Sequence, residues 1–229
     1  MSDAPRTVPS AFESVTTLAS VTFKRLLRGK AIWICIAIAL LPVIFATIAH
    51  GDNKASKLLT FQVVVVALLA PFLVASSIGD DIEDRTLTYL WSRPLPRWTY
   101  VVGKLVAVAP IALVTVLASW VAACEVGLHS TPWKWSYIGL GGGTLAVSCV
   151  AAGIATLAPK YGTALSVSYM LMIDLVIGEI PANLQSLSIG RAAREIAKHD
   201  HVGSSVTTLL VFAGIWLTIG FLRIRKIEA

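Results

Sequence analysis

The residues with the clearest chemical potential form an acidic cluster at 80–84, with the sequence Asp-Asp-Ile-Glu-Asp. It lies in the stretch SIGDDIEDRTLTYLWSRPLPRW at 76–97, which also carries three arginines and two prolines. Carboxylate oxygens are hard ligands that suit Mg²⁺. A group of like charges on a short amphipathic segment can also dock against opposite charges on another protein. The cluster therefore indicates either a metal site or a docking surface.

Other patterns that would carry chemistry are missing from the sequence. No Gly-x-x-x-x-Gly-Lys-Ser/Thr motif is present, and Gly29-Lys30 and Gly103-Lys104 lack both the upstream glycine and the following hydroxyl residue. No Ser/His/Asp set stands out by spacing. The chain is therefore not expected to hydrolyse ATP or to act as an enzyme by itself.

The composition indicates an integral membrane protein. Hydrophobic residues make up 56% of the chain and charged residues 14%, whereas a soluble domain is about 25% charged. A helix needs about 20 apolar residues to cross the hydrocarbon core. Six stretches meet this requirement, at Ala31–His50, Leu58–Ile78, Tyr100–Cys124, Trp135–Ala158, Tyr161–Ile180 and Val206–Phe221. We expect an all-α membrane protein with six transmembrane helices.

The distribution of basic residues predicts the orientation. Six spans place both termini on one side, and 13 of the 19 lysines and arginines flank that side. Because basic residues are enriched in cytoplasmic segments, we expect both termini and the stretch 79–97 in the cytoplasm of a multi-pass protein of the inner (plasma) membrane. The net charge of +6 then belongs to the membrane flanks, and no nucleic-acid partner is expected.

Two segments outside the spans have their own patterns. Ser10 and Glu13 form a capping box, after which apolar residues recur at helical spacing, at Phe12, Val15, Ala19, Phe23 and Leu26. This predicts an amphipathic helix over 10–28 that lies in the membrane interface. Before the last span, the outer segment 181–205 is either a re-entrant or interfacial cap or a plain loop. Within it, Arg191 and Glu195 are spaced to pair on a short helix.

Two features lie within the apolar stretches themselves. Gly139 and Gly143 have the spacing that lets two helices approach closely, so we expect tight packing there. Asp174 lies midway along the fifth stretch, where a carboxylate costs roughly 2.5–3.5 kcal/mol on insertion scales. It either lines a path through the membrane or makes a helix contact, or it hydrogen-bonds a neighbouring serine or threonine. Glu179 lies nearer the outer boundary and is grouped with Asp174.

The acidic stretch and the layout resemble the permease subunits of ABC transporters of the type-2 exporter class. In that family an acidic helix after the second span is followed by hydrophobic residues, a proline, an arginine and a Gly-Lys pair. Arg85 stands where the family usually has glycine. The matching positions here are Glu83, Thr86, Leu87, Leu90, Pro94, Arg97, Gly103 and Lys104.

The resemblance implies a single permease domain over 1–229 that couples to a separate ATP-binding subunit through a cytoplasmic coupling helix in 79–97. ATP and Mg²⁺ would bind that partner, with no cofactor on this chain. A second permease copy or a paralogue would complete the path in the lipid bilayer. The residues expected to contact the ATPase are Asp80, Asp81, Glu83, Asp84, Arg85, Thr86, Leu87, Leu90, Pro94 and Arg97.

Two alternatives remain at this point. The acidic cluster is similar to the Mg²⁺-diphosphate sites of intramembrane prenyltransferases, but a second Asp-rich segment and further spans are missing. A structural or regulatory membrane protein without transport is the other alternative. The sequence indicates neither the transported substrate nor whether the two permease chains are identical.

Overall fold

The computed structural model describes residues 10–29, 31–51, 53–83, 96–180 and 183–226. All the regular structure in these ranges is helical, which confirms the all-α prediction. The long helices are α1 (Ala11–Arg28), α2 (Ala31–Ile48), α3 (Lys54–Glu83), α5 (Trp98–Leu128), α6 (Lys134–Leu157) and α10 (Val202–Lys226).

The six predicted spans are confirmed. In the described ranges, six helical segments are long and apolar enough to cross a membrane, five of them within α2, α3, α5, α6 and α10 and one at Pro159–Glu179. Helices α3 and α5 extend several residues beyond the predicted apolar stretches, because polar flanking residues continue the helical turns. Pro42, Pro71 and Pro110 each lie inside a continuous helix.

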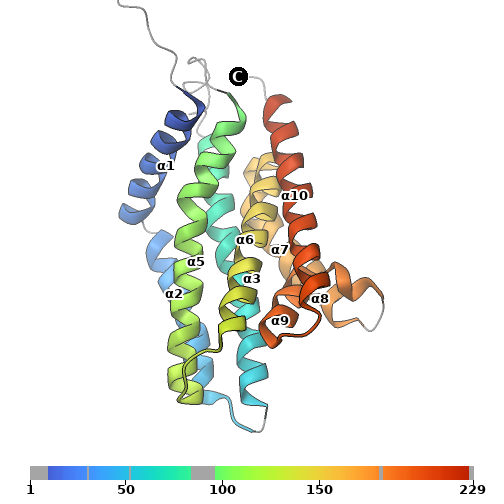
Figure 1. The fold of residues 1–229 in the computed structure, drawn as a ribbon. Coiled ribbons are helices and arrows are strands. Elements are labelled where there is room, and N and C mark those ends of the chain that lie inside the picture. Colours follow the sequence, from blue (N-terminus) through green and yellow to red (C-terminus); the bar gives the residue numbers. More distant parts are fainter. Residues whose placement is uncertain (1–9, 30, 52, 84–95, 181–182, 227–229) are drawn as a thin grey trace, which may run out of the picture.

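Helices α3 and α6 form the centre of the bundle. Within their apolar windows 72% and 78% of the residues are buried, against 17% in both α2 and α10. The axes of these four helices lie roughly alongside that of α5, and the chain direction alternates from one span to the next (Figure 1). The outward faces of α2 and α10 are thus left for lipid or another subunit.

The two ends of the bundle differ. Helix α1, the last turns of α3, the start of α5 and the last turns of α10 lie at one end, which we call the termini end (Figure 1). At the other, the distal end, lie helix α9 (Ile189–Lys198) and the α5–α6 turn (Figure 1). The even number of spans explains why α1 and the last turns of α10 lie at the same end.

Helix α1 begins with the predicted capping box. The Glu13 amide donates to Ser10 Oγ at 3.2 Å, and the Ser10 amide donates to Glu13 Oε2 at 3.0 Å. Its buried residues are Ser14 and Thr22, whereas Phe12 is 76% exposed. The apolar residues of α1 are therefore divided, with Ala19 and Leu26 packed against the core and Phe12 and Phe23 exposed and available to lipid. That the helix lies in the membrane interface stays a prediction.

The fifth span is irregular in a way that the sequence does not indicate. A 3₁₀ turn at Pro159–Tyr161 leads into α7 (Gly162–Ser168), then a π-helical stretch at Tyr169–Asp174, then α8 (Leu175–Glu179). A further 3₁₀ turn, Asn183–Leu187, precedes α9. The π-helical stretch ends at the one acidic residue in the middle of the span, and π-helical turns are frequent at functional positions.

Helix α9 packs tightly on α6, as the glycine spacing predicts. A side-chain carbon on Gly139 would meet the Ala193 carbonyl oxygen and would lie 2.7 Å from the Ala197 amide nitrogen. One on Gly143 would lie 2.8 Å from the Ala193 Cβ. Glycine is required at Gly139 because the backbone of α9 occupies the space of any side chain.

Candidate functional site

At the termini end, a buried carboxylate joins three helices. Asp81, in the last turns of α3, accepts from Arg25 Nη1 of α1 at 2.8 Å and lies 2.5 Å from Lys104 Nζ of α5. The Tyr100 hydroxyl, also on α5, lies 3.4 Å from the second carboxylate oxygen. We call Arg25, Asp81, Tyr100 and Lys104 the α3 anchor.

The α3 anchor is largely shielded from solvent. Asp81 is 8% exposed and Lys104 is 4% exposed, and Lys104 also donates to the Ser77 carbonyl at 2.9 Å. Removing one member of a buried ion pair leaves its partner charged without compensation, so such a pair is costly to break. The Arg25 side chain is 60% exposed and contributes less. The anchor therefore holds the last described turns of α3 against α1 and α5.

Close packing supports the same position. A side-chain carbon on Gly79 would lie 2.9 Å from the Pro159 carbonyl oxygen, so the last turns of α3 press against the α6–α7 connection. A small polar cavity of about 160 Å³ lies beside the anchor, between α1, α3 and α5. It is lined by Thr22, Arg25, Leu26, Ser76, Ser77 and Lys104, among others.

The predicted coupling residues fall into three groups. Asp80 and Glu83 lie on the last turns of α3. Asp81 and Arg97 lie near the two ends of the segment 79–97. Arg97 Nη1 donates to the Arg225 carbonyl at 2.7 Å, near the end of α10. The others lie outside the described residues, namely Asp84, Arg85, Thr86, Leu87, Leu90 and Pro94. The structure thus ties both flanks of the segment to the bundle.

Asp174 is a buried cap for a helix. It is 2% exposed, and its oxygens accept the backbone amides of Ile189 at 2.7 Å and Gly190 at 2.8 Å. The Ser188 hydroxyl also donates to it, at 3.2 Å. Because the first amides of a helix lack internal partners and carry partial positive charge, a carboxylate there is stabilised. The hydrogen bond from Ser188 fits the alternative in which Asp174 bonds a neighbouring serine, and a role of Asp174 in transport stays a prediction.

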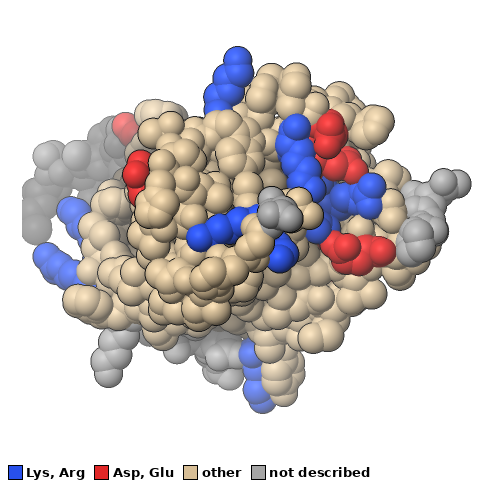
Figure 2. Space-filling view, turned by 90° about the horizontal axis from the view of Figure 1, so that it is seen from below, with Lys and Arg blue, Asp and Glu red and all other residues tan. Residues whose placement is uncertain are grey.

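The distal end carries a group of charged side chains. Glu179, at the end of α8, is paired with Arg194, with 2.5 Å between Oε1 and Nη2. The predicted pair of Arg191 and Glu195 is confirmed, with Nε 2.7 Å from Oε1. Figure 2 views the molecule from this end and shows acidic and basic side chains grouped on one part of the face.

The environment of Glu195 favours its charged form. Partial burial by itself raises the pKa of this carboxyl. Hydrogen bonds from Ser205 and Arg191, together with the nearby charges of Arg191 and His201, outweigh burial and lower the pKa below its usual value. Glu195 is therefore held as a carboxylate between α9 and α10.

Sequence reasoning missed the partners of Asp81 within its own chain. The sequence pattern places Lys104 in the Gly-Lys pair of the family resemblance, and nothing in it singles out Arg25 as a partner of Asp81. A signal was present, since Lys104 lies inside the third apolar stretch, and a lysine there needs a buried partner.

The comparison with protein families gives one result. The model of a family described as "ABC-2 family transporter protein" matches residues 20–175. The matched range begins within α1, continues through α6 and ends at the start of α8, so it includes both flanks of the stretch 79–97. A search among curated proteins found no match.

Proposed function

The chain belongs to the ABC-2 family of transporter proteins, and from this premise we propose that it is the permease subunit of an ATP-driven exporter. The family and the six apolar helices make it a multi-pass membrane component of a transporter. The observation that carries the proposal is the family match, because it spans more than half of the chain and includes the segment expected to couple.

We assign ATP hydrolysis to a separate subunit. The sequence lacks the glycine-rich motif that binds nucleotide phosphates, so ATP and Mg²⁺ would bind the partner. We place the termini end in the cytoplasm and the partner on the segment 79–97. Near the two ends of this segment, Asp81 is paired with Lys104 of α5 and Arg97 is hydrogen-bonded to α10. A force applied to the segment would therefore pass into α3, α5 and α10.

The α3 anchor divides the acidic cluster by role. Asp81 is committed to Arg25 and Lys104, so it acts as a positioning residue for the segment. Asp80, Glu83 and Asp84 are then the carboxylates proposed to meet basic groups of the partner. The commitment of Asp81 also weakens the Mg²⁺-enzyme alternative, because one of the four carboxylates is already paired with two cations.

The remaining partners are lipid and a second permease chain. Helices α2 and α10 expose large apolar side chains such as Trp33, at 72% exposure, and Leu210, at 67%. Exposed apolar surface on this scale is suited to a bilayer and also offers room for a paired copy or a paralogue. We propose that two permease chains together form the path.

A charge reversal at the coupling segment tests the proposal. The tagged chain with Glu83→Lys and Asp84→Lys would be purified from its native host in mild detergent. We expect normal membrane insertion but about a tenfold loss of co-purified ATP-binding polypeptide and of ATPase activity in the eluate, since repulsive charges at an interface cost several kcal/mol.

The matched control is Glu125→Lys, which makes the same change at an exposed position near the distal end of α5. This variant should retain the partner in full. Equal recovery of the ATPase with the double reversal and with the control would refute docking at this segment.

A further inference from the structure

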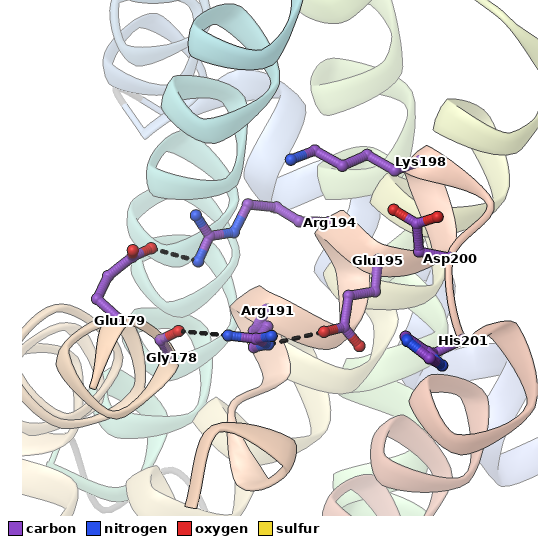
Figure 3. A pocket seen from close by; sticks show the side chains of 8 residues that line it. All are labelled: Gly178, Glu179, Arg191, Arg194, Glu195, Lys198, Asp200 and His201. Carbon is purple, nitrogen blue, oxygen red and sulfur yellow. Dashed lines mark hydrogen bonds and ion pairs between the residues drawn. The ribbon is translucent and has the colours of Figure 1, made fainter. Parts of the chain in front are cut away.

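The distal pocket is a site that the coupling mechanism does not use. It has a volume of about 300 Å³ and lies between the end of α8, the outer face of α9 and the turn before α10 (Figure 3). Its charged lining residues are three acids and three bases, namely Glu179, Glu195, Asp200, Arg191, Arg194 and Lys198. His201 also contributes to the wall.

Four of these charges are fixed within the protein. Arg194 is paired with Glu179, and Arg191 with Glu195. Arg191 also donates to the Gly178 carbonyl at 3.3 Å, and the Ser205 hydroxyl donates to Glu195 at 2.8 Å. These contacts hold both guanidinium groups in place before any ligand arrives, which lowers the cost of ordering them on binding.

The other two charges are available. Within the described part of the chain, no hydrogen bond or ion pair is formed by the side chains of Lys198 and Asp200, and both residues are exposed. In Figure 3 the Lys198 amine extends over the Arg194 guanidinium, whereas the Asp200 carboxylate lies on the side of Glu195 and His201. The pocket thus offers one available ammonium, that of Lys198, and one available carboxylate, that of Asp200.

This division of charge selects the class of ligand. The three acids and three bases cancel, so a simple anion is attracted by Lys198 and repelled by Asp200, and a simple cation the reverse. A zwitterion satisfies both, because guanidinium and ammonium groups bind a phosphate strongly and carboxylates bind an amine. We propose that the distal pocket binds a zwitterionic group that joins a phosphate to an ammonium, with Lys198 and Asp200 as its binding residues.

The surroundings of the pocket favour a phospholipid headgroup as the source. Large apolar side chains of the fifth span are exposed on the turns leading to it, including Met172 at 69% and Val176 at 51%. These would contact acyl chains while the headgroup occupies the charged pocket. A soluble phosphodiester zwitterion such as glycerophosphoethanolamine has the same charges but would gain nothing from these side chains.

Binding by the purified full-length chain in detergent tests the proposal. Calorimetry would compare dihexanoyl phosphatidylethanolamine, glycerophosphoethanolamine and the anionic dihexanoyl phosphatidylglycerol. We expect the ethanolamine lipid to bind more tightly than the anionic lipid. Lys198→Ala and Asp200→Ala should each weaken its binding about tenfold, as expected for loss of one charge-assisted contact.

The control variant is Lys54→Ala, which removes a lysine at the start of α3, outside the pocket lining, and should bind as the unmodified chain does. Tighter binding of the lipid than of glycerophosphoethanolamine assigns the headgroup as source, and equal binding assigns a soluble zwitterion. Equal affinity for the anionic lipid, no binding by the unmodified chain, or unchanged binding by both pocket variants would overturn the proposal. Failure here leaves the ATPase docking untouched, because that is measured at the other end of the molecule.

Discussion

Two buried carboxylates are stabilised by different partners at two levels of the bundle. Asp81 is neutralised by cations from α1 and α5, whereas Asp174 accepts backbone amides at the start of α9. In both cases the chain itself supplies the compensation that burial of a charge demands. Each carboxylate therefore fixes one helix against another, α3 at the termini end and α9 toward the distal end.

Replacing Asp81 should destabilise the protein more than replacing its exposed partner. In Asp81→Asn the buried Lys104 loses its counter-charge, and we expect a loss of about 3 kcal/mol in the free energy of unfolding. Arg25→Gln should cost less than about 1 kcal/mol, because the Arg25 side chain is 60% exposed and exposed pairs contribute little. Denaturation of the purified protein in mixed micelles measures both values.

A double variant separates the ion pair from other effects of the substitution. Asp81→Asn combined with Lys104→Met should cost less than the sum of the two single changes, because neither charge is then left alone. Additive losses, or unfolding of Asp81→Asn at the unmodified midpoint, would show that the ion pair does not hold α3.

Sequence spacing predicts only some of the contacts between residues. The capping box and the Arg191–Glu195 pair could be predicted, because both lie within one helical turn. The contact of Arg25 with Asp81 joins residues 56 positions apart, and that of Gly190 with Asp174 joins residues 16 apart. Such contacts depend on how the helices pack, which local spacing does not specify.

At the scale of elements, the spans were predictable because length and apolarity are properties of a single helix. The π-helical stretch at Tyr169–Asp174 was not, since its residues differ little from those of an ordinary span. Helix α9 could be predicted in part. Its existence follows from its own pattern, whereas its burial against α6 became clear only from the structure, in which Ile189, Ala193 and Ile196 are buried.

Gly139→Ala should loosen the attachment of α9. The added carbon would overlap the backbone of α9 at Ala193 and Ala197, and overpacking of this kind costs about 1–3 kcal/mol. We expect a lower unfolding midpoint and faster protease cleavage within 181–205, measured on the purified protein.

Gly214→Ala is the matched control, because Gly214 is also inside a long helix and a side-chain carbon there would meet nothing within 4 Å. It should leave both readouts unchanged or raise the midpoint slightly, as expected from helix propensity. If the two alanine variants behave alike, α9 is not held by close contact with α6.

At the scale of the whole molecule, α3 links the two ends. Its 30 residues correspond to about 45 Å at a rise of about 1.5 Å per residue, enough to cross a bilayer with its headgroups. One end carries the anchor at Asp81, and Val63 nearer the other end lies against Gly190 of α9. A displacement of the proposed coupling segment would therefore reach α9 through a single buried helix.

The coupling proposal depends on the orientation of the molecule, for which we predict that both termini lie in the cytoplasm. In a chain with its three cysteines replaced, Thr131→Cys on the α5–α6 turn should react with a membrane-impermeant maleimide added to intact cells. Ser10→Cys, at the start of α1, should react only after the cells are opened. Both positions are exposed, so a difference in labelling reports the side of the membrane and not burial.

The physical reason for this expected orientation is the excess of lysine and arginine in the segments assigned to the side of the termini, 13 of 19, because basic segments are retained in the cytoplasm during insertion. Labelling of Ser10→Cys from outside would place the stretch 79–97 away from cytoplasmic ATP, and a docked ATPase could not then drive this chain.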